Sequence, residues 1–177
     1  VEASLKRNPE VMAYGIDKIF SMPENIDVLL CGPGLKNDRW SKNIFNEAIS
    51  VNNFGVVILD AGALHFIDEN NLETSKDKVL TPHPGEAAKL LGISNNEVQE
   101  DRVSAAKSIS NKFSASIILK GKETIICSNG DEDLFICTEG GPELSSGGTG
   151  DVLAGVLSAL IAPVSYTHLR AHETLLD

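Results

Sequence analysis

The sequence is poor in cysteine, in basic residues and in long apolar runs, and each shortage narrows the class of protein. The three cysteines have no metal-type spacing, which argues against a zinc site. Asp and Glu number 25 against 15 Lys and Arg, and the net charge of −10 argues against a nucleic-acid or anionic-membrane surface. No apolar run is long enough to cross a membrane, and the first residues lack a signal-peptide pattern. Cys127 and Cys137 flank a predicted turn and could pair in a disulfide across a hairpin, but we expect reduced core cysteines in a cytoplasmic protein instead.

What is present fits one globular domain of the α/β class. Apolar residues make up 42% of the 177-residue chain and charged residues 23%, which is ordinary for such a domain. Short apolar runs alternate with segments of helical periodicity. The predicted strands are 26–31, 56–60, 79–81 and 116–120, and the predicted helices are 41–50, 85–92 and 101–113. Strands of continuous apolar character that alternate with helices predict a mostly parallel sheet between two helical layers, an α/β/α architecture.

Two segments depart from this alternation. Residues 123–138 hold two β-type runs on either side of Asn129-Gly130-Asp131, which predicts an antiparallel hairpin near one edge of the sheet. Residues 163–177 begin with Pro163, where we expect the last helix to end. This stretch resembles translated sequencing-adapter read-through, so we interpret 163–177 as a non-native tail and 1–162 as an incomplete domain.

The most informative stretch is "LSSGGTGDVLAGVLSAL", residues 144–160. Its glycines cost backbone entropy on folding, so a special conformation or a close neighbour must require them. Successive amides at Gly148, Thr149 and Gly150, placed before a helix, predict an anion hole for phosphate. Asp151 would then lie beside the hole as a general base for phosphoryl transfer to a hydroxyl. The alternative is that Asp151 merely caps the helix. The apolar residues that follow predict one buried helix face, made by Val152, Leu153, Val156, Leu157, Leu160 and Ile161.

Other unusual residues follow the predicted strands, where ligands bind in open α/β sheets. Gly32-Pro33-Gly34 is either a plain turn or a place where a ligand approaches the backbone. Asp60 either caps a helix or holds a metal-bound water. His83 lies between two prolines that stiffen its backbone, so its ring is either a ligand contact or a passive turn residue. Lys120 and Lys122 would share one face if the strand extended that far, and they are either phosphate contacts or solvated surface lysines.

Taken together, these motifs resemble one family. "CGPGL", "DAGAL", "LTPHPGEAAKLLG", "DRVSAAKSI", "ILKGKETII" and "GGTGDVLAGVLSALIA" occur in this order and are similar to the ADP- or ATP-dependent NAD(P)H-hydrate dehydratases, which have the ribokinase-like fold. The resemblance runs from about Asn8 to Ala162, and "TPHPGE" followed by "GGTGD" is its specific part. It implies repair of the S epimer of NADH or NADPH hydrate: a nucleotide phosphorylates the ring hydroxyl, and phosphate then leaves to restore the reduced nicotinamide.

The resemblance also implies roles for individual residues. Gly34, His83 and Asp151 would contact the hydrated dinucleotide, with Asp151 as the base. ADP, or its product AMP, would be contacted by Lys120, Gly121, Lys122, Glu123, Thr124 and Gly150. Mg²⁺ would accompany the nucleotide through ligands that the sequence leaves unassigned, and the expected assembly is a homotetramer without nucleic-acid or membrane partners. Gly62, His65 and Gly141 depart from the family's usual pattern, in which an acid, an asparagine and another asparagine occur.

Two other functions stay open at this point. A ribokinase-like kinase of a small alcohol, such as a vitamin precursor, would use the same glycine loop and the same base. A nucleotide-binding domain without turnover would need only the phosphate contacts. The dehydratase releases free phosphate and reduced nicotinamide, whereas the kinase makes a stable phosphoester, so the products separate these functions.

Overall fold

The structure is a computed structural model that describes residues 26–50, 54–68, 72, 77–141, 144 and 146–173, with the backbone alone for 163–173. Its sheet has six strands in the order of the sequence. These are β1 (Ile26–Cys31), β2 (Phe54–Leu59), β3 (Asp77–Leu80), β4 (Ser116–Leu119), β5 (Thr124–Cys127) and β6 (Leu134–Cys137). β1 to β4 are parallel, while β5 and β6 run antiparallel to their neighbours. The predicted mostly parallel sheet with a hairpin at one edge is confirmed.

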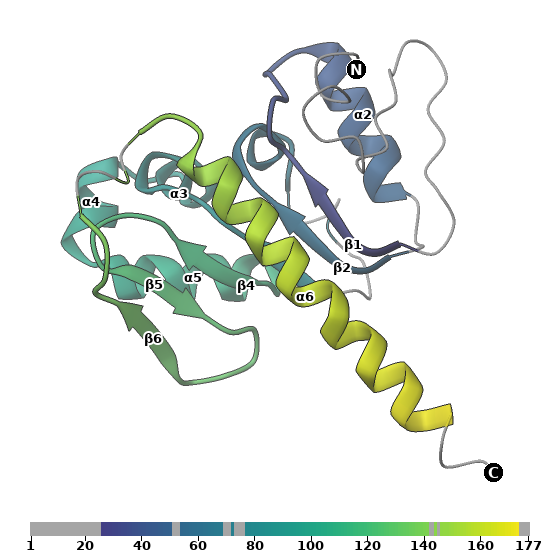
Figure 1. Ribbon diagram of the computed structural model, residues 1–177. Coiled ribbons are helices and arrows are strands. Elements are labelled where there is room, and N and C mark those ends of the chain that lie inside the picture. Colours follow the sequence, from purple (N-terminus) through teal and green to yellow (C-terminus); the bar gives the residue numbers. More distant parts are fainter. Residues whose placement is uncertain are drawn as a thin grey trace.

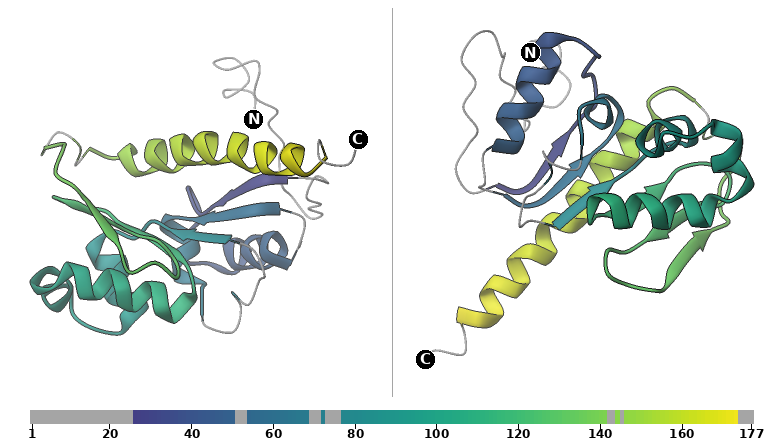
Figure 2. Two further views of the ribbon diagram at one scale, coloured as in Figure 1. Left: turned by 90° about the horizontal axis from the view of Figure 1, so that it is seen from below. Right: turned by 180° about the vertical axis from the view of Figure 1, so that it is seen from behind.

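Helices cover both faces of this sheet, as the predicted three-layer architecture requires. They are α2 (Arg39–Ser50), the 3-10 helix η1 (Ala61–His65), α3 (Pro84–Leu91), α4 (Asn95–Glu100), α5 (Arg102–Phe113) and α6 (Thr149–Glu173). Figure 2 shows α2, α3, α4 and α5 on one face and α6 alone on the other. α6 packs across β1 and β2 (Figure 1). Since both faces are covered, central strand residues such as Val57, Leu80 and Leu119 are fully buried.

The helix α4 was not predicted from the sequence, although its signal is present. Ser94 accepts a hydrogen bond from the amide of Glu97, and the Glu97 carboxylate accepts one from the amide of Ser94. This reciprocal capping box begins α4. Asp101 then accepts from the amide of Ser104 and begins α5. The predicted helix 101–113 therefore begins where expected, after a separate short helix.

Two predictions about α6 are wrong. The helix continues through Pro163 to Glu173, although a proline inside a helix removes one backbone hydrogen bond and its ring crowds the carbonyl four residues earlier. The six apolar residues expected on one buried face are also divided. Val152, Val156 and Leu160 are exposed, at 66%, 51% and 66%. The contact with the sheet is made instead through Ala154, which is buried, and its half-buried neighbours Leu153 and Leu157.

The hairpin β5–β6 keeps its two cysteines apart. In its register Cys127 lies opposite Leu134 and Cys137 lies opposite Thr124. Both thiols are free in the structure, as is that of Cys31. Cys31 and Cys127 are buried, as expected of core cysteines, whereas Cys137 is exposed, so that expectation is wrong for Cys137. Among the helices that the structure describes, none is long and apolar enough to cross a membrane.

Candidate functional site

Backbone hydrogen bonds bring the residues that follow β2, β3 and β4 into one row. The amide of Asp60 donates to the Cys31 carbonyl at 3.1 Å, and the amide of Thr81 donates to the Leu59 carbonyl at 3.1 Å. The amide of Lys120 donates to the Pro82 carbonyl at 2.9 Å. Each bond extends the strand pairing beyond the regular strand. The three side chains are therefore anchored at the carboxyl edge of the sheet, where ligands bind in this fold class.

Asp60 lies at the centre of this row. Its side chain is almost fully buried, and Oδ1 accepts hydrogen bonds from the Thr81 hydroxyl at 2.7 Å and from the Lys120 ammonium at 2.6 Å. The sequence left open whether Asp60 caps a helix or holds a metal-bound water. The structure shows that Oδ1 forms an ion pair with Lys120. Asp60 precedes η1, but its side chain makes no capping hydrogen bond.

The first turn of α6 lies against this ion pair. A Cβ atom built at Gly150 would be 3.4 Å from Nζ of Lys120 and 4.0 Å from Oδ2 of Asp60. The glycine-rich stretch and the residue after β4 were both predicted to bind nucleotide, and the fold brings them into contact. Gly150 leaves the ammonium of Lys120 next to the backbone of the helix, because it has no side chain to come between them.

Only some of the backbone amides at the start of α6 have a hydrogen-bond acceptor. The first helical hydrogen bond runs from the amide of Val152 to the Gly148 carbonyl at 3.0 Å. The amide of Thr149 donates to the Ser146 carbonyl at 3.4 Å, so this member of the predicted anion hole already has an acceptor. Helix geometry leaves the amides of Gly150 and Asp151 without an acceptor inside the helix. Inside the first turn of α6, the donors left for an anion are thus those of Gly150 and Asp151, and the part of Gly148 in the anion hole stays a prediction.

The side chain of Asp151 is not an N-cap. Gly148 provides the carbonyl of the first helical bond, so Asp151 lies three residues further on, inside the first turn. Asp151 is exposed to solvent, and a carboxylate in this turn interacts favourably with the helix dipole. A substrate hydroxyl can therefore reach it from outside.

His83 begins α3, and its ring is fixed by the helix itself. Nδ1 accepts from the amides of Gly85 at 3.0 Å and Glu86 at 3.3 Å. The amide of His83 donates to Oε2 of Glu86 at 2.8 Å, which completes a capping box. Nε2 lies 3.5 Å from Oε1 of Glu86, and the side chain is 57% exposed. His83 is thus rigid and accessible, as a ligand contact requires, and at the same time structural.

Gly34 occupies a tight turn. The amide of Leu35 donates to the Gly32 carbonyl at 3.0 Å, and Gly34 has φ +80°. Proline followed by a glycine of positive φ is typical of a type II turn. Gly32 lies directly over Asp60, since a Cβ atom there would overlap the Asp60 carbonyl oxygen. The turn is therefore next to the row of site residues, and contact of Gly34 with substrate stays a prediction.

The loop that follows Lys120 differs from the expectation. β4 ends at Leu119 and β5 begins at Thr124, so the strand does not extend to Lys122 and the condition for a shared face is not met. Arg102 holds this loop: its Nη2 donates to the carbonyls of Leu119 at 3.2 Å and Lys120 at 3.4 Å. Burial lowers the pKa of Arg102, and the charge of Glu123 partly opposes this. Sequence reasoning missed Arg102, because no local pattern distinguishes a helix arginine that reaches a distant loop.

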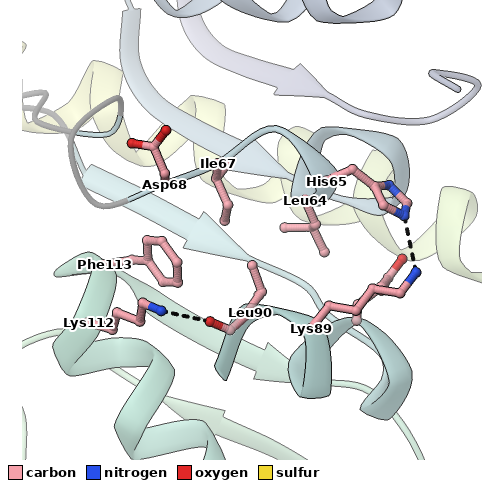
Figure 3. Close-up of a pocket in the computed structure, with 9 residues that line it drawn as sticks. Leu64, His65, Ile67, Asp68, Lys89, Leu90, Lys112 and Phe113 are labelled. Carbon is pink, nitrogen blue, oxygen red and sulfur yellow. Dashed lines mark hydrogen bonds between the residues drawn. The ribbon is translucent and has the colours of Figure 1, made fainter. Parts of the chain in front are cut away.

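A cavity of about 530 Å³ lies between η1, α3 and the end of α5 (Figure 3). None of the predicted site residues lines it, but Glu86, which caps α3 with His83, does. At one side Nε2 of His65 is 3.4 Å from Nζ of Lys89. His65 is one of the residues that depart from the family's usual pattern. Another, Gly62, packs so closely that a Cβ atom would overlap the Leu35 carbonyl oxygen.

Comparison with known proteins identifies the family of this chain. Residues 1–174 match the protein family described as NAD(P)H-hydrate dehydratase. The chain belongs to this family. It is 37% identical over 160 residues to the bifunctional NAD(P)H-hydrate repair enzyme of Escherichia coli, which covers 89% of this chain and 30% of that protein. It is 33% identical to the ADP-dependent (S)-NAD(P)H-hydrate dehydratase of Neisseria meningitidis, over 87% of this chain and 53% of that protein.

Comparison with solved structures identifies the fold. The ADP/ATP-dependent NAD(P)H-hydrate dehydratase of Bacillus subtilis, co-crystallized with ATP/Mg²⁺, superimposes with a TM-score of 0.69 at 30% identity. The match covers 80% of this chain and 49% of that one. A ribokinase-like protein of Enterococcus faecalis matches with a TM-score of 0.66 at 28% identity. The ribokinase-like fold is confirmed, and the chain spans about a third to a half of the length of these relatives.

Proposed function

We propose that the protein containing this chain is a nucleotide-dependent dehydratase that restores NADH or NADPH from the S epimer of its hydrate. The single observation that carries the proposal is the close approach of the Lys120 ammonium to Gly150 in the first turn of α6, where a Cβ atom would be 3.4 Å from Nζ. It puts a cation, two backbone donors and the exposed Asp151 at one edge of the sheet. Phosphoryl transfer needs this combination of positive groups around the phosphate and a base beside the acceptor hydroxyl.

The reaction would proceed in two steps. Asp151 takes the proton of the ring hydroxyl as the hydroxyl oxygen attacks the terminal phosphorus of ADP or ATP. The bond from phosphorus to its bridging oxygen breaks, which releases AMP or ADP. The phosphate then leaves the ring with the electron pair of the carbon–oxygen bond, while the adjacent ring carbon loses a proton, and the reduced nicotinamide is restored. Phosphate is a far better leaving group than hydroxide, which explains why a nucleotide is consumed to remove water.

The remaining site residues have binding roles in this proposal. Lys120 and the amides of Gly150 and Asp151 would hold the phosphates. The loop from Gly121 to Thr124 would contact the rest of the nucleotide. His83, through its exposed ring, and the turn at Gly34 would contact the hydrated dinucleotide. His83 and Lys120 lie on neighbouring strand ends, joined by the hydrogen bond from the Lys120 amide to the Pro82 carbonyl, which supports one continuous site.

Mg²⁺ fits this site as part of the nucleotide. Mg²⁺ takes oxygen ligands and is commonly held by substrate phosphates together with one or two carboxylates. Within the described part of the chain, no group of three or more His, Cys, Asp and Glu side chains is placed to hold a metal. Oδ1 of Asp60 is used by Lys120 and Thr81. The ion would therefore be held mainly by the phosphate oxygens, where it would neutralise part of their charge.

We also place the protein in the cytoplasm and expect a homo-oligomer, a tetramer as the family resemblance suggests. Free thiols at all three cysteines are consistent with a reducing compartment. Light scattering on the purified protein would give the number of subunits directly.

The proposal is tested with the protein encoded by the complete reading frame that contains this chain. It is incubated with hydrated NADH or NADPH, Mg²⁺, and either ADP or ATP, and the absorbance of the reduced nicotinamide is followed together with free phosphate. Absorbance that recovers only with nucleotide, in step with phosphate release, supports the dehydratase. A stable phosphoester of an added alcohol would point to a kinase. If the protein bound nucleotide but formed no product from any of these substrates, the result would favour a nucleotide-binding domain without turnover.

A further inference from the structure

The ion pair of Asp60 and Lys120 is the feature that neither the motifs nor the family match explains. Asp60 is 1% exposed and its Oδ1 lies 2.6 Å from Nζ of Lys120. A buried pair of this kind is weak evidence for stability, because the loss of hydration offsets much of the attraction. Its location beside the phosphate-binding turn therefore calls for a functional explanation.

Both partners are fixed by the backbone before their side chains meet. The amide of Asp60 is bonded to β1 through the Cys31 carbonyl, and that of Lys120 is bonded to the Pro82 carbonyl after β3. The Thr81 hydroxyl, from the strand end between them, donates to the same Oδ1 that receives the ammonium. The carboxylate is thus held in one orientation by three strand ends.

This arrangement sets the direction of the Lys120 ammonium. A free lysine side chain has four rotatable bonds and loses considerable rotamer entropy when it binds a ligand. Asp60 has already fixed this side chain next to Gly150. One of its three N–H donors is used by Asp60, and the others are left for an anion. An ammonium fixed before the ligand arrives is a more effective contact than one that must be ordered during binding.

We infer that Asp60 is a positioning residue: it holds the Lys120 ammonium against the first turn of α6, so that Lys120 and the amides of Gly150 and Asp151 meet the same phosphate group. The inference deepens the proposed function and rests on it. Asp60 itself does not touch the phosphate, because it carries the same sign of charge. Asp60 affects nucleotide binding only by positioning Lys120.

A double-mutant cycle with Asp60→Asn and Lys120→Met tests this in the full-length protein. ADP binding is measured by calorimetry in the presence of Mg²⁺, and kcat and KM for ADP are measured with hydrated NADH. We expect K120M to weaken ADP binding about 30- to 100-fold and D60N about 10-fold, the range for charge-assisted contacts. In the K120M background, D60N should change binding by less than about 2-fold, since residues that act as a unit are not additive.

Asp77→Asn is the matched control. Asp77 is an exposed carboxylate at the opposite end of β3 from Thr81, so the same change of charge there should leave ADP binding and turnover unaltered. Thermal unfolding of all variants separates positioning from folding. D60N should lower the melting temperature because Lys120 loses its partner, and the double variant should recover part of that loss. A role in stability alone would not make the effect on ADP binding depend on Lys120.

The outcomes separate the inference from the proposed function. Additive effects of D60N and K120M on ADP binding overturn the inference, even if the hydrate is repaired. Non-additive effects on binding, in a protein that repairs no hydrate with either nucleotide, support the inference and overturn the proposed function. Failure of the wild-type protein to bind either ADP or ATP overturns both.

Discussion

His83 and Glu86 cap the first turn of α3 reciprocally: Nδ1 of His83 accepts from the Glu86 amide at 3.3 Å, and Oε2 of Glu86 accepts from the His83 amide at 2.8 Å. One residue thus holds a helix end and presents a largely exposed imidazole ring. A substitution of His83 will mix the two effects unless the capping group is retained.

Asparagine separates these effects, because its side-chain oxygen caps helices well. We expect His83→Asn to keep the unfolding free energy close to that of the wild type while KM for the hydrate rises and nucleotide affinity changes little. His83→Ala should show the same rise in KM and also lose about 1 kcal/mol of stability. Chemical denaturation and steady-state kinetics of both variants provide the measurements. An unaltered KM for the hydrate in both would remove His83 from the substrate site.

Asp151→Asn tests the general base. We expect kcat to fall by roughly 100-fold or more, the scale of losing a positioned proton acceptor, while ADP binding persists. The exposed location of Asp151 makes loss of folding improbable as a cause. Asp133→Asn, an equally exposed acid in the β5–β6 turn, is the control and should retain full activity. Wild-type turnover in D151N would contradict the assignment.

Two glycine-to-alanine changes should have opposite effects on stability. Gly62→Ala puts a methyl group into the Leu35 carbonyl and should destabilise the protein by roughly 1–3 kcal/mol, as overpacking does. Gly155→Ala, inside α6 with no atom within 4 Å of the new methyl group, should stabilise it by about 0.5–1 kcal/mol. Urea unfolding measures both. If G62A were neutral, the close approach of η1 to the turn at Gly34 would not exist in solution.

The cysteines should differ in reactivity. Burial raises the pKa of the Cys31 thiol to about 11, so at pH 8 only about a thousandth of it would be thiolate. Cys127 is buried and Cys137 is exposed. A colorimetric thiol reagent should therefore detect one fast thiol in the native protein at pH 8 and all three after denaturation. Cys137→Ser should abolish the fast phase. Because the pKa of Cys31 is raised, its reaction should accelerate as the pH rises toward 11. Fast reaction of a second thiol at pH 8 would show that the sheet opens readily.

The local sequence was sufficient for elements whose signals are local. Continuous apolar runs identified the buried strands, and Asn129-Gly130-Asp131 identified the hairpin, because period and turn chemistry depend on neighbouring residues. The capping box at Ser94 was an equally local signal, although α4 was not predicted. Prediction failed for α6, where apolar residues lie all round the helix: periodicity cannot say which of several apolar faces meets the sheet.

The candidate site also combines features that have a local sequence signal with features that have none. The sequence by itself determined that a glycine turn precedes a helix with Asp151 in its first turn, that His83 is held rigidly at the start of α3, and that the chain has the motifs of a hydrate dehydratase. Only the tertiary structure decided that Asp60 pairs with Lys120, that Gly150 lies against this pair, and that Arg102 supports the following loop. These contacts join residues far apart in the chain, and parallel strands place them side by side through hydrogen bonds whose partners no local pattern specifies.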